Sequence, residues 1–582
     1  MATDSGGAWE ADVIVVGAGP AGLTAAAELA RHGVRVRVID RNPGPTLHSR
    51  ASVVHVRTQE TLSAMGLADR FVARAYPLEA ISLHAFGKFM GGIRLSGADS
   101  AYPMPRIIGQ HVTERLLLER LDELAVPVER GVEALGLADD GEHITLRLRR
   151  GGIESDLAAA YVIAADGADS PLRTAAEIPF DGDKTDAFEF LQTDCDVRWS
   201  YPTGRSYLFV TKDRFLGLFP FDADGAYRIV CARADQDPAV TQTPDLEEIE
   251  AILREIADPD ATLLEPRWLS RTRTAPKLAK KFRSGRLFLV GDAAHVHLPI
   301  GGQGMNSGMQ DGFNLGWKLA AVLRKRSPSA LLHSYSAERQ AIAKELIDFD
   351  REWAEVLSSA AKSPATADGK GFDPAATQSY FVRHGRYTAG TAAHYGPSIL
   401  TGEATYQHLA AGLTIGMRLH SAPVIRLADA KPIHLGHTVK ADGRWSIFAF
   451  AGAGDTAAPH SGIGRLCHFL ADAPQSPVRK FTPAGEDIDS VIDVRAIFQQ
   501  SHHDLAVETM PGFLLPAKGR FGLRDYEKIF TADRWSGDIF STRGIDREGG
   551  CMVVVRPDQY VAHVLPLDGF EPLAAFFDGF MM

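Results

Sequence analysis

The chain opens on a strand, turn and helix pattern that is typical of a nucleotide-binding fold. Residues 12–16 are a β-branched apolar run, as expected of a parallel strand that is buried on both faces. A glycine-rich turn over residues 17–22 follows, and an alanine-rich helix occupies residues 23–31. In residues 34–39 valines alternate with Arg35 and Arg37, which predicts a second strand that ends at Asp40. The order predicts a complete βαβ unit.

Similar elements recur over the first 330 residues and predict an α/β fold. A helix is expected from Thr113, as its N-cap, to Leu124, and another from about Met305 to Arg324. Between them, the alternating pattern of residues 144–148 and the apolar runs at 161–165 and 287–290 predict further strands.

Residues 187–275 follow a different pattern, with apolar and polar positions alternating as in Tyr207–Val210 and Tyr227–Val230. This period of two predicts an antiparallel sheet inserted into the nucleotide fold. Residues 357–400 are rich in Ala, Ser, Gly and Pro and are interpreted as a linker. Strand patterns return near residue 412. The expected domains are residues 1–186 and 276–400 for nucleotide binding, 187–275 for substrate and 412–582 for a separate C-terminal α/β or α+β domain, with strands expected at 445–450, 551–555 and 560–564.

Composition narrows the class of partner. The 582 residues carry a formal net charge of -11, which argues against nucleic acid, because phosphate binding requires a basic face. The four cysteines lie far apart without a C-x-x-C pair, as in a reducing cytosol. The N-terminus lacks a signal-peptide pattern, and glycines interrupt the apolar stretch over residues 13–30. A soluble, cytoplasmic protein without a membrane or nucleic-acid partner is therefore expected.

The first glycine cluster has the spacing of a diphosphate-binding turn. Side chains at Gly17 and Gly19 would block a diphosphate from the backbone amides at the helix start, and Gly22 lets the helix lie close to the strand. Asp40, about 20 residues further on, can accept the ribose hydroxyl groups. The cluster predicts a dinucleotide without deciding between NAD and FAD. The cofactor-binding residues expected here are Gly17, Gly19, Ala21, Gly22, Asp40 and Arg41.

A second glycine-rich element favours FAD over NAD as the bound cofactor. Asp292 follows a buried strand and can accept a hydrogen bond from the ribityl chain. The helix start at residues 299–306 would direct backbone N–H groups and the positive end of the helix dipole at the pyrimidine edge of the flavin. FAD is long enough to reach both elements. The residues expected to contact it here are Asp292, Gly302, Gly304, Met305 and Asn306.

With these motifs in order, the sequence resembles the single-component aromatic hydroxylases, the family of para-hydroxybenzoate and phenol hydroxylases. Residues 166–170, beginning at Asp166, together with Arg173 resemble the second fingerprint of that family, which serves both FAD and the nicotinamide cofactor. Arg50 and Gln110 lie where members contact FAD. The resemblance covers the first 350 residues and extends to the C-terminus through larger members with a thioredoxin-like third domain.

The resemblance implies tightly bound, non-covalent FAD and transient NADPH or NADH as the reductant. In this family O2 adds at the flavin C4a position, and the resulting hydroperoxide hydroxylates a phenolic or polycyclic aromatic ring. Substituted phenols and polyketide-derived phenols both stay open, with a slight preference for the polyketide-tailoring subgroup from residues 299–304. The third domain lacks a C-x-x-C pair, so we expect an assembly or packing role for it, and the chain could form a homodimer.

The group that would activate the substrate departs from the family pattern. Phenol hydroxylases have a carboxylate, and other members a histidine, where this chain has Ser52, and serine is a poor base. By resemblance, the carbonyl of Pro299 is a candidate contact for the phenol. Asp222 either lines the pocket or belongs to a turn. Arg271 and Arg273 either bind an anionic substrate group or are exposed strand arginines.

The sequence leaves two other functions open, and we expect it to lack a metal site. The same scaffold supports Baeyer–Villiger oxygen insertion or epoxidation, and a non-catalytic flavin-binding assembly protein is a third hypothesis. We expect no metal site. His295 and His297 lie inside the flavin motif, and the adjacent His502 and His503 would point to opposite faces of a strand.

Overall fold

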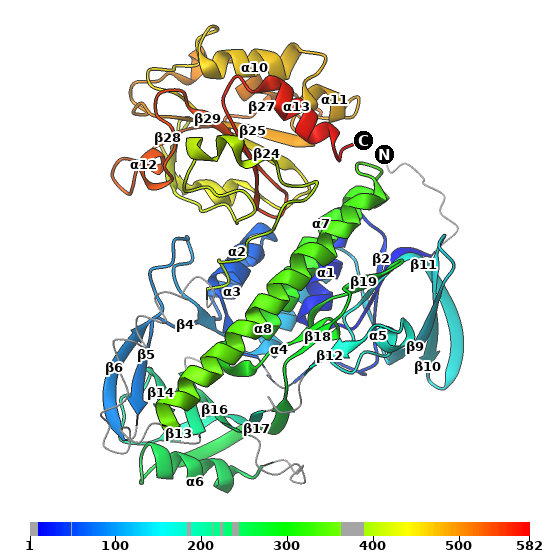
Figure 1. Ribbon diagram of the computed structural model, residues 1–582, viewed down its shortest axis with the longest axis vertical. Coiled ribbons are helices and arrows are strands. Elements are labelled where there is room, and N and C mark those ends of the chain that lie inside the picture. The colour runs from blue at the N-terminus through cyan, green and yellow to red at the C-terminus, as the bar shows by residue number, and fades with distance from the viewer. Residues whose placement is uncertain are drawn as a thin grey trace.

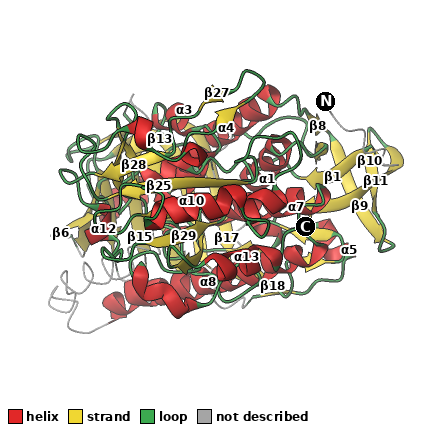
Figure 2. Ribbon diagram, turned by 90° about the horizontal axis from the view of Figure 1, so that it is seen from above, coloured by secondary structure: helices red, strands yellow, loops and turns green. Residues whose placement is uncertain are grey.

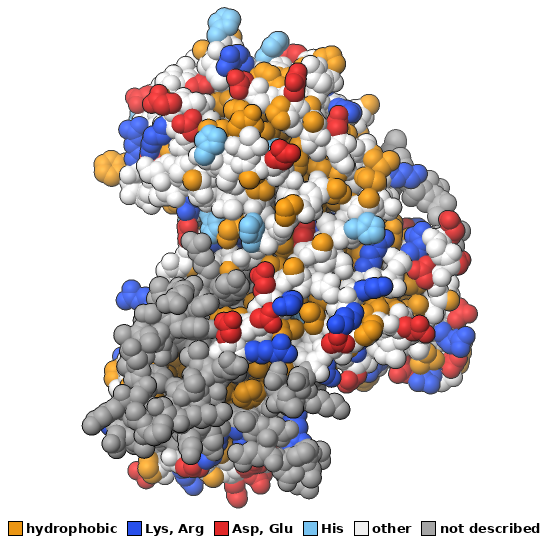
Figure 3. Space-filling view, viewed as in Figure 1, with side chains coloured by type: hydrophobic (Ala, Val, Ile, Leu, Met, Phe, Trp, Pro, Cys, Tyr) orange, Lys and Arg blue, Asp and Glu red, His pale blue; other side chains and the backbone are white. Residues whose placement is uncertain are grey.

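The computed structural model describes residues 10–47, 49, 51–85, 87–182, 188–211, 214–221, 225–234, 244–362 and 389–582. The nucleotide-binding part and a second sheet form the lower body of the molecule, and the C-terminal domain lies above them (Figure 1). Seen from above, the strands β9 (Val132–Asp139), β10 (Ile144–Arg150) and β11 (Ile153–Ala164) project at one end (Figure 2). Charged side chains of both signs are mixed over this end on the face shown in Figure 3, and Arg149 of β10 pairs with Glu133 of β9 at 2.6 Å.

The nucleotide-binding part is built on a sheet in which β1 (Ala11–Val16) lies between β11 and β2 (Val36–Asp40), all three parallel. Val13, Ile14 and Val15 of β1 are fully buried. A strand that is covered on both faces of its sheet has such a continuous run of apolar residues. The predicted βαβ opening is confirmed. The sheet also contains β19 (Arg283–Ser284), β20 (Leu287–Leu289) and β8 (Val128–Arg130), with β9 and β10 attached through β11.

Two helices that meet through glycines lie against this sheet. A Cβ atom at Gly312 of α7 (Gly304–Leu323) would lie 2.8 Å from the carbonyl oxygen of Ala21 in α1 (Pro20–Arg31), so glycine is required for the observed approach. Close packing of α1 on α7 brings together the N-terminal ends of both helices. The other helices of this part are α2 (Val56–Ala64), α3 (Ala68–Val72), α4 (Gln110–Glu123), α5 (Pro171–Ala175) and α8 (His333–Lys362).

The start of α4 corrects the expected helix boundary. The helix begins at Gln110 with Gly109 as its N-cap, whereas Thr113 is buried one turn inside. The hydroxyl oxygen of Ser49 accepts a hydrogen bond from the Gln110 backbone N–H at 2.7 Å. A distant residue therefore supplies the cap that Thr113 was expected to provide.

The second sheet has the order β17-β13-β16-β15-β14-β5-β6. Its pairs from β17 to β14 are antiparallel as predicted, but β14 pairs in parallel with β5, so that β5 and β6 join the sheet from outside the expected insert. Helix α6 (Leu246–Ile256) covers one face. The strands are β17 (Thr262–Thr274), β13 (Phe188–Arg198), β16 (Ala226–Ala234), β15 (Arg214–Pro220), β14 (Ser206–Val210), β5 (Ala80–Ala85) and β6 (Lys88–Arg94).

The C-terminal domain has a sheet of the thioredoxin-like order β28-β25-β24-β29-β30, extended by β22 and β23. Strands β24, β25 and β28 are parallel, and β29 and β30 are antiparallel additions. All four cysteines of the chain are free and buried. The elements are β22 (Pro423–Arg426), β23 (Pro432–His434), β24 (Trp445–Phe450), β25 (Ile492–Phe498), β28 (Ile529–Ala532), β29 (Cys551–Val555), β30 (Val561–Leu565), α10 (Gly462–Asp472), α11 (Pro477–Phe481), α12 (Ile539–Thr542) and α13 (Phe570–Asp578).

The segment between the nucleotide-binding part and the C-terminal domain differs from the expected linker. Part of the expected linker is helical, because α8 continues to Lys362, and residues 363–388 lie outside the described part. None of the described helices combines the length and apolar character that a membrane crossing requires.

The remaining strands are β3 (Val53–Val54), β4 (Tyr76–Pro77), β7 (Arg106–Ile107), β12 (Phe180–Asp181), β18 (Lys277–Ala279), β21 (His295–Val296), β26 (Ala517–Lys518) and β27 (Leu523–Arg524).

Candidate functional site

One large cavity, of about 1040 Å³, joins the nucleotide-binding part to the second sheet and to the C-terminal domain. The starts of α1 and α7 line it on one side, the inner face of the second sheet lines it on another, and Arg418 and His420 reach it from beyond residue 389. Many of the residues expected to bind the cofactor line this cavity, namely Gly19, Ala21, Gln110, Asp292, Gly302, Gly304 and Met305, as does Pro299.

The three glycines of the first turn have different reasons to be glycine. Gly17 has φ +105°, and a Cβ there would collide with the carbonyl oxygen of Ala165. A Cβ on Gly22 would collide with the carbonyl oxygen of Gly17. Gly19 has an ordinary φ of -81°, and a Cβ there would meet no protein atom within 4 Å. Of these three, Gly19 faces open space, which is where a diphosphate would approach the amides of α1.

The acidic end of β2 lies behind this turn. One carboxylate oxygen of Asp40 accepts the Ala18 backbone N–H at 2.7 Å, and the other accepts the Asn42 N–H at 2.7 Å. Asp40 therefore shapes the glycine turn directly, and it is not among the described residues that line the large cavity. Arg41 follows it and is exposed. Their contact with a ribose stays a prediction.

The Gly291–Ala293 turn is held from two sides. Asp311 of α7 accepts the Gly291 backbone N–H at 3.0 Å and the Arg339 Nε–H at 2.7 Å, and its carboxylate lies 2.7 Å from His295 Nε2. Burial raises the pKa of Asp311, but His295 and Arg339 outweigh that effect and hold the pKa below its usual value. The fixed turn leaves Asp292 exposed at the cavity.

Arg173 holds the other side of the same turn. It donates hydrogen bonds to the carbonyl oxygens of Ala293 at 3.0 Å and Ala168 at 2.8 Å. The second fingerprint thus touches the Gly291–Ala293 turn through this arginine. Asp166 contributes an unpaired buried oxygen, Oδ1, and burial raises the pKa of its carboxyl group. A buried acceptor without a protein partner is a position where a ligand hydroxyl can donate.

At the start of α7, some residues line the cavity and others hold the turn in place from the protein interior. Gly304 lines the cavity, and a Cβ there would meet no atom within 4 Å. Gly302 adopts φ +61°, the left-handed region that favours glycine. Asn306 is buried: its amide donates to the carbonyls of Val53 at 2.8 Å and Gly302 at 2.7 Å, and its oxygen accepts the His55 N–H at 2.9 Å. Asn306 therefore supports the turn from behind, while Met305 lines the cavity.

Gln110 lines the opposite wall and donates from its amide to Glu114 at 2.9 Å. Arg50 and Asp222 lie outside the described residues, so their predicted roles stay predictions. The carbonyl oxygen of Pro299 accepts the Gly302 N–H at 3.1 Å, which leaves one of its two lone pairs for a substrate. Ser52 also lines the cavity.

The second sheet presents its two faces to different surroundings. Leu191, Leu216 and Ile229 are fully buried and pack with α6. Alternate residues line the cavity instead, chiefly Leu208, Phe215, Phe219 and Val230, with the polar Gln192 and Arg228 among them. The alternation follows from the period of two in a strand. It makes a largely apolar floor that excludes water from reacting groups.

Arg228 is the buried cation of that floor. It is 1% exposed and pairs with Asp194 directly opposite on β13, through Nε and through Nη2 at 2.8 Å. Arg271, a candidate for an anionic substrate, bonds instead to Glu189 at 2.6 Å and Glu248 at 2.7 Å. Neither of the two alternatives describes Arg271, because two carboxylates hold its guanidinium group and its side chain is only 6% exposed. Arg273 does line the cavity.

The histidines occupy supporting positions. His295 bonds to Asp311, and His297 Nδ1 lies 3.6 Å from Asp350 behind the Pro299 turn. His502 and His503 lie in a turn after β25 with ring centroids 4.0 Å apart, so the expected opposite-facing strand arrangement is wrong. Within the described ranges, no three histidine, cysteine or carboxylate side chains are grouped to hold a metal ion.

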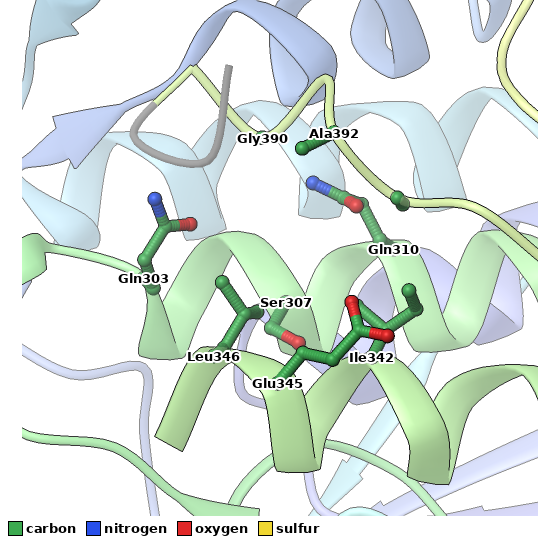
Figure 4. A pocket seen from close by; sticks show the side chains of 9 residues that line it. Gln303, Ser307, Gln310, Ile342, Glu345, Leu346, Gly390 and Ala392 are labelled. Carbon is green, nitrogen blue, oxygen red and sulfur yellow. The ribbon is translucent and has the colours of Figure 1, made fainter. Parts of the chain in front are cut away.

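A second, small cavity of about 20 Å³ lies between α7 and α8, beside residues 390–393 (Figure 4). Gln303, which precedes α7, and Ser307 and Gln310 of α7 face Glu345 of α8 across it. Its size suits about one water molecule. Of the two cavities described here, the large one has room for an aromatic substrate.

These residues fit FAD. Gly19 and Gly304 leave open space beside two helix N-termini at the cavity, whereas Asp166 is not among the described residues that line it. Bound FAD would supply the electron transfer and the activation of O2. The starts of α1 and α7 would hold its diphosphate and ring through backbone N–H groups.

The sequence analysis missed three charged residues of the site, Asp311, Arg339 and Arg228. The signal that could have revealed them is a charged residue at an otherwise apolar position of a helix or strand.

Comparisons with known proteins agree with this geometry. Residues 10–350 match the family described as FAD binding domain, and residues 393–582 match the phenol hydroxylase C-terminal dimerisation domain. The chain is 39% identical to 3-hydroxybenzoate 4-monooxygenase of Comamonas testosteroni over 98% of this chain and 95% of that protein. It is 38% identical to 6-methylpretetramide 4-monooxygenase of Streptomyces rimosus over 58% of this chain and 61% of that protein.

Solved structures show the same architecture. The anhydrotetracycline hydroxylase OxyS from Streptomyces rimosus superposes with a TM-score of 0.67 at 25% identity, over 96% of each chain. Aklavinone-11 hydroxylase, in a ternary complex with FAD and aklavinone, has a TM-score of 0.69 at 22% identity and shares the fold over 98% of this chain and 99% of its own. The flavin-binding geometry, the two matched domains and the full-length relative lead to one conclusion: the chain belongs to the FAD-dependent aromatic hydroxylases.

Proposed function

We propose that the protein hydroxylates a monocyclic phenolic acid of the hydroxybenzoate type, with NADH or NADPH as a transient electron donor. The observation that carries the proposal is a buried arginine, Arg228, in a largely apolar cavity floor. Arginine suits a carboxylate because its planar group donates two parallel hydrogen bonds. The full-length relative named for 3-hydroxybenzoate supports the same substrate class.

The roles of the floor residues follow from their chemistry. Arg228 uses Nε and Nη2 on Asp194, so Nη1 is its remaining nitrogen for a substrate carboxylate. The indole Nε1–H of Trp268 also donates to Asp194 at 2.5 Å, which reduces the hold of Asp194 on the arginine. We assign Pro299 the contact to the phenol through its free lone pair. Asp222 stays a second candidate for phenol activation.

A polycyclic phenol is the second candidate substrate. The large cavity and the relative named for 6-methylpretetramide favour it. We also propose a homodimer formed through residues 393–582, because that range matches a dimerisation domain.

The test is NADH and NADPH oxidation by the purified holoenzyme with 3-hydroxybenzoate, 4-hydroxybenzoate, phenol and a polycyclic phenol. We expect stimulation by a hydroxybenzoate, with a product that gains one oxygen atom on the ring and little H2O2. Arg228→Lys should raise KM for that acid by about tenfold, the cost of one charged hydrogen bond, and change KM for phenol much less. Faster coupled turnover of the polycyclic phenol would overturn the monocyclic assignment.

A further inference from the structure

A buried group of charged residues lies where the C-terminal domain meets α7 and α8. Arg556, which follows β29, donates to Glu338 of α8 at 2.7 and 2.9 Å and to Asp558 at 2.9 and 2.7 Å. Lys318 of α7 donates to the same Glu338 at 2.7 Å. Arg556 and Lys318 are fully buried, and Glu338 is 3% exposed. Charges buried so deeply require this full set of partners.

Tyr395 links this group of charged residues to the Gly291–Ala293 turn. Its ring stacks on Tyr560 of the C-terminal domain, with centroids 4.2 Å apart. Its hydroxyl oxygen accepts the Arg339 Nη1–H at 3.3 Å and the Asn314 Nδ2–H at 3.4 Å. Arg339 in turn donates to Asp311 at 2.7 Å. Asp311 accepts the Gly291 N–H, so each step from Tyr560 to the turn is a direct contact.

We propose that Tyr395 and Arg339 are positioning residues through which docking of the C-terminal domain sets the affinity for FAD. Arg339 has one guanidinium group shared between Asp311, Tyr395 and Ser307, so its orientation depends on all three. A docked C-terminal domain fixes Tyr395 by stacking. Tyr395 fixes Arg339, and Arg339 fixes the Asp311 carboxylate that holds Gly291. The proposal concerns the cofactor and is independent of the substrate.

The coupling must act in both directions, because linkage between two binding equilibria is reciprocal. FAD that orders the Gly291–Ala293 turn should also tighten the docking of residues 556–560. The C-terminal domain then contributes to cofactor binding through the Tyr395–Arg339 contact. A packing role alone would stabilise the chain equally with and without FAD.

Tyr395→Phe tests the proposal, because it removes the hydroxyl group and keeps the ring stacked on Tyr560. We expect FAD to dissociate from this variant with a Kd about fivefold higher than in the wild type, the lower end of usual coupling. Hydrogen exchange supplies a second measurement. FAD should slow exchange in residues 556–560 of the wild-type protein, and Tyr395→Phe should remove most of that difference.

Gln559→Ala is the matched control. Gln559 accepts a hydrogen bond from Arg57 at 2.7 Å across the same domain junction, but it has no contact with Arg339 or Asp311 among the bonds described. We expect it to keep the wild-type Kd for FAD and the FAD-dependent exchange. A wild-type Kd in Tyr395→Phe would overturn the proposal. So would an equal loss of FAD affinity in Gln559→Ala, since any disturbance of the junction would then suffice.

Discussion

Gly19 and Gly17 show how two glycines of one motif can serve different purposes. Gly17 is required by the protein itself, since its φ of +105° and its contact with Ala165 leave no place for a side chain. Gly19 has a backbone conformation that any residue adopts and open space around its Cβ position. The glycine at position 19 is therefore explained by the approach of a ligand to the backbone.

Gly19→Ala should separate cofactor binding from stability. We expect the free energy of unfolding of the FAD-free protein to change by less than about 0.5 kcal/mol, because the new methyl group meets no protein atom. The Kd for FAD should rise by about tenfold or more, measured by titration of the apoprotein. Gly17→Ala is the contrast and should destabilise the apoprotein itself. Equal unfolding losses in the two variants would contradict this account.

At the scale of elements, the sequence predicted those helices and strands whose signals lie close together along the chain. The strand, turn and helix from Ala11 to Asp40 were predictable because their signals lie within a few residues of one another. The start of α4 was not, since its cap comes from Ser49, and neither was the parallel pairing of β14 with β5. Those features depend on contacts between distant segments. The glycine motifs located the cavity, but the buried Arg228 required knowledge of which sheet face points inward.

The packing of α7 on α1 gives a prediction at this scale. Gly312→Ala would place a methyl group 2.8 Å from backbone atoms of Ala21 and Ala25, so the helices must separate. We expect a loss of about 1–3 kcal/mol in the free energy of unfolding, the usual cost of overpacking, together with weaker FAD binding. Gly304→Ala, on the same helix, meets no atom within 4 Å and should leave unfolding of the apoprotein unchanged. Urea denaturation of both apoproteins measures the difference.

At the scale of the whole molecule, the junction between the domains combines a buried group of charged residues with apolar contacts such as that of Trp317 with Trp445. Glu338 has a pKa lowered to about 2: burial opposes its ionisation, but Arg556 and Lys318 outweigh burial. Arg556, which makes two hydrogen bonds to Glu338, is the larger of these two causes. The sequence alone could not show this arrangement, because Arg556 and Glu338 lie 218 residues apart.

The titration of Lys318 predicts how stability depends on pH. Burial lowers the pKa of Lys318 to about 8 from 10.5, although Glu338 opposes the shift. Between these values the unfolded chain holds more protons than the folded one, so this group makes folding more favourable as the pH rises from 8 towards 10.5. The gain should reach about 1 kcal/mol between about pH 7 and pH 9, and Lys318→Met should lack it. Urea denaturation of both proteins across that range measures the gain as the change in their difference. A difference in unfolding free energy that stays constant from about pH 7 to pH 9 would show that Lys318 keeps an ordinary pKa at the junction.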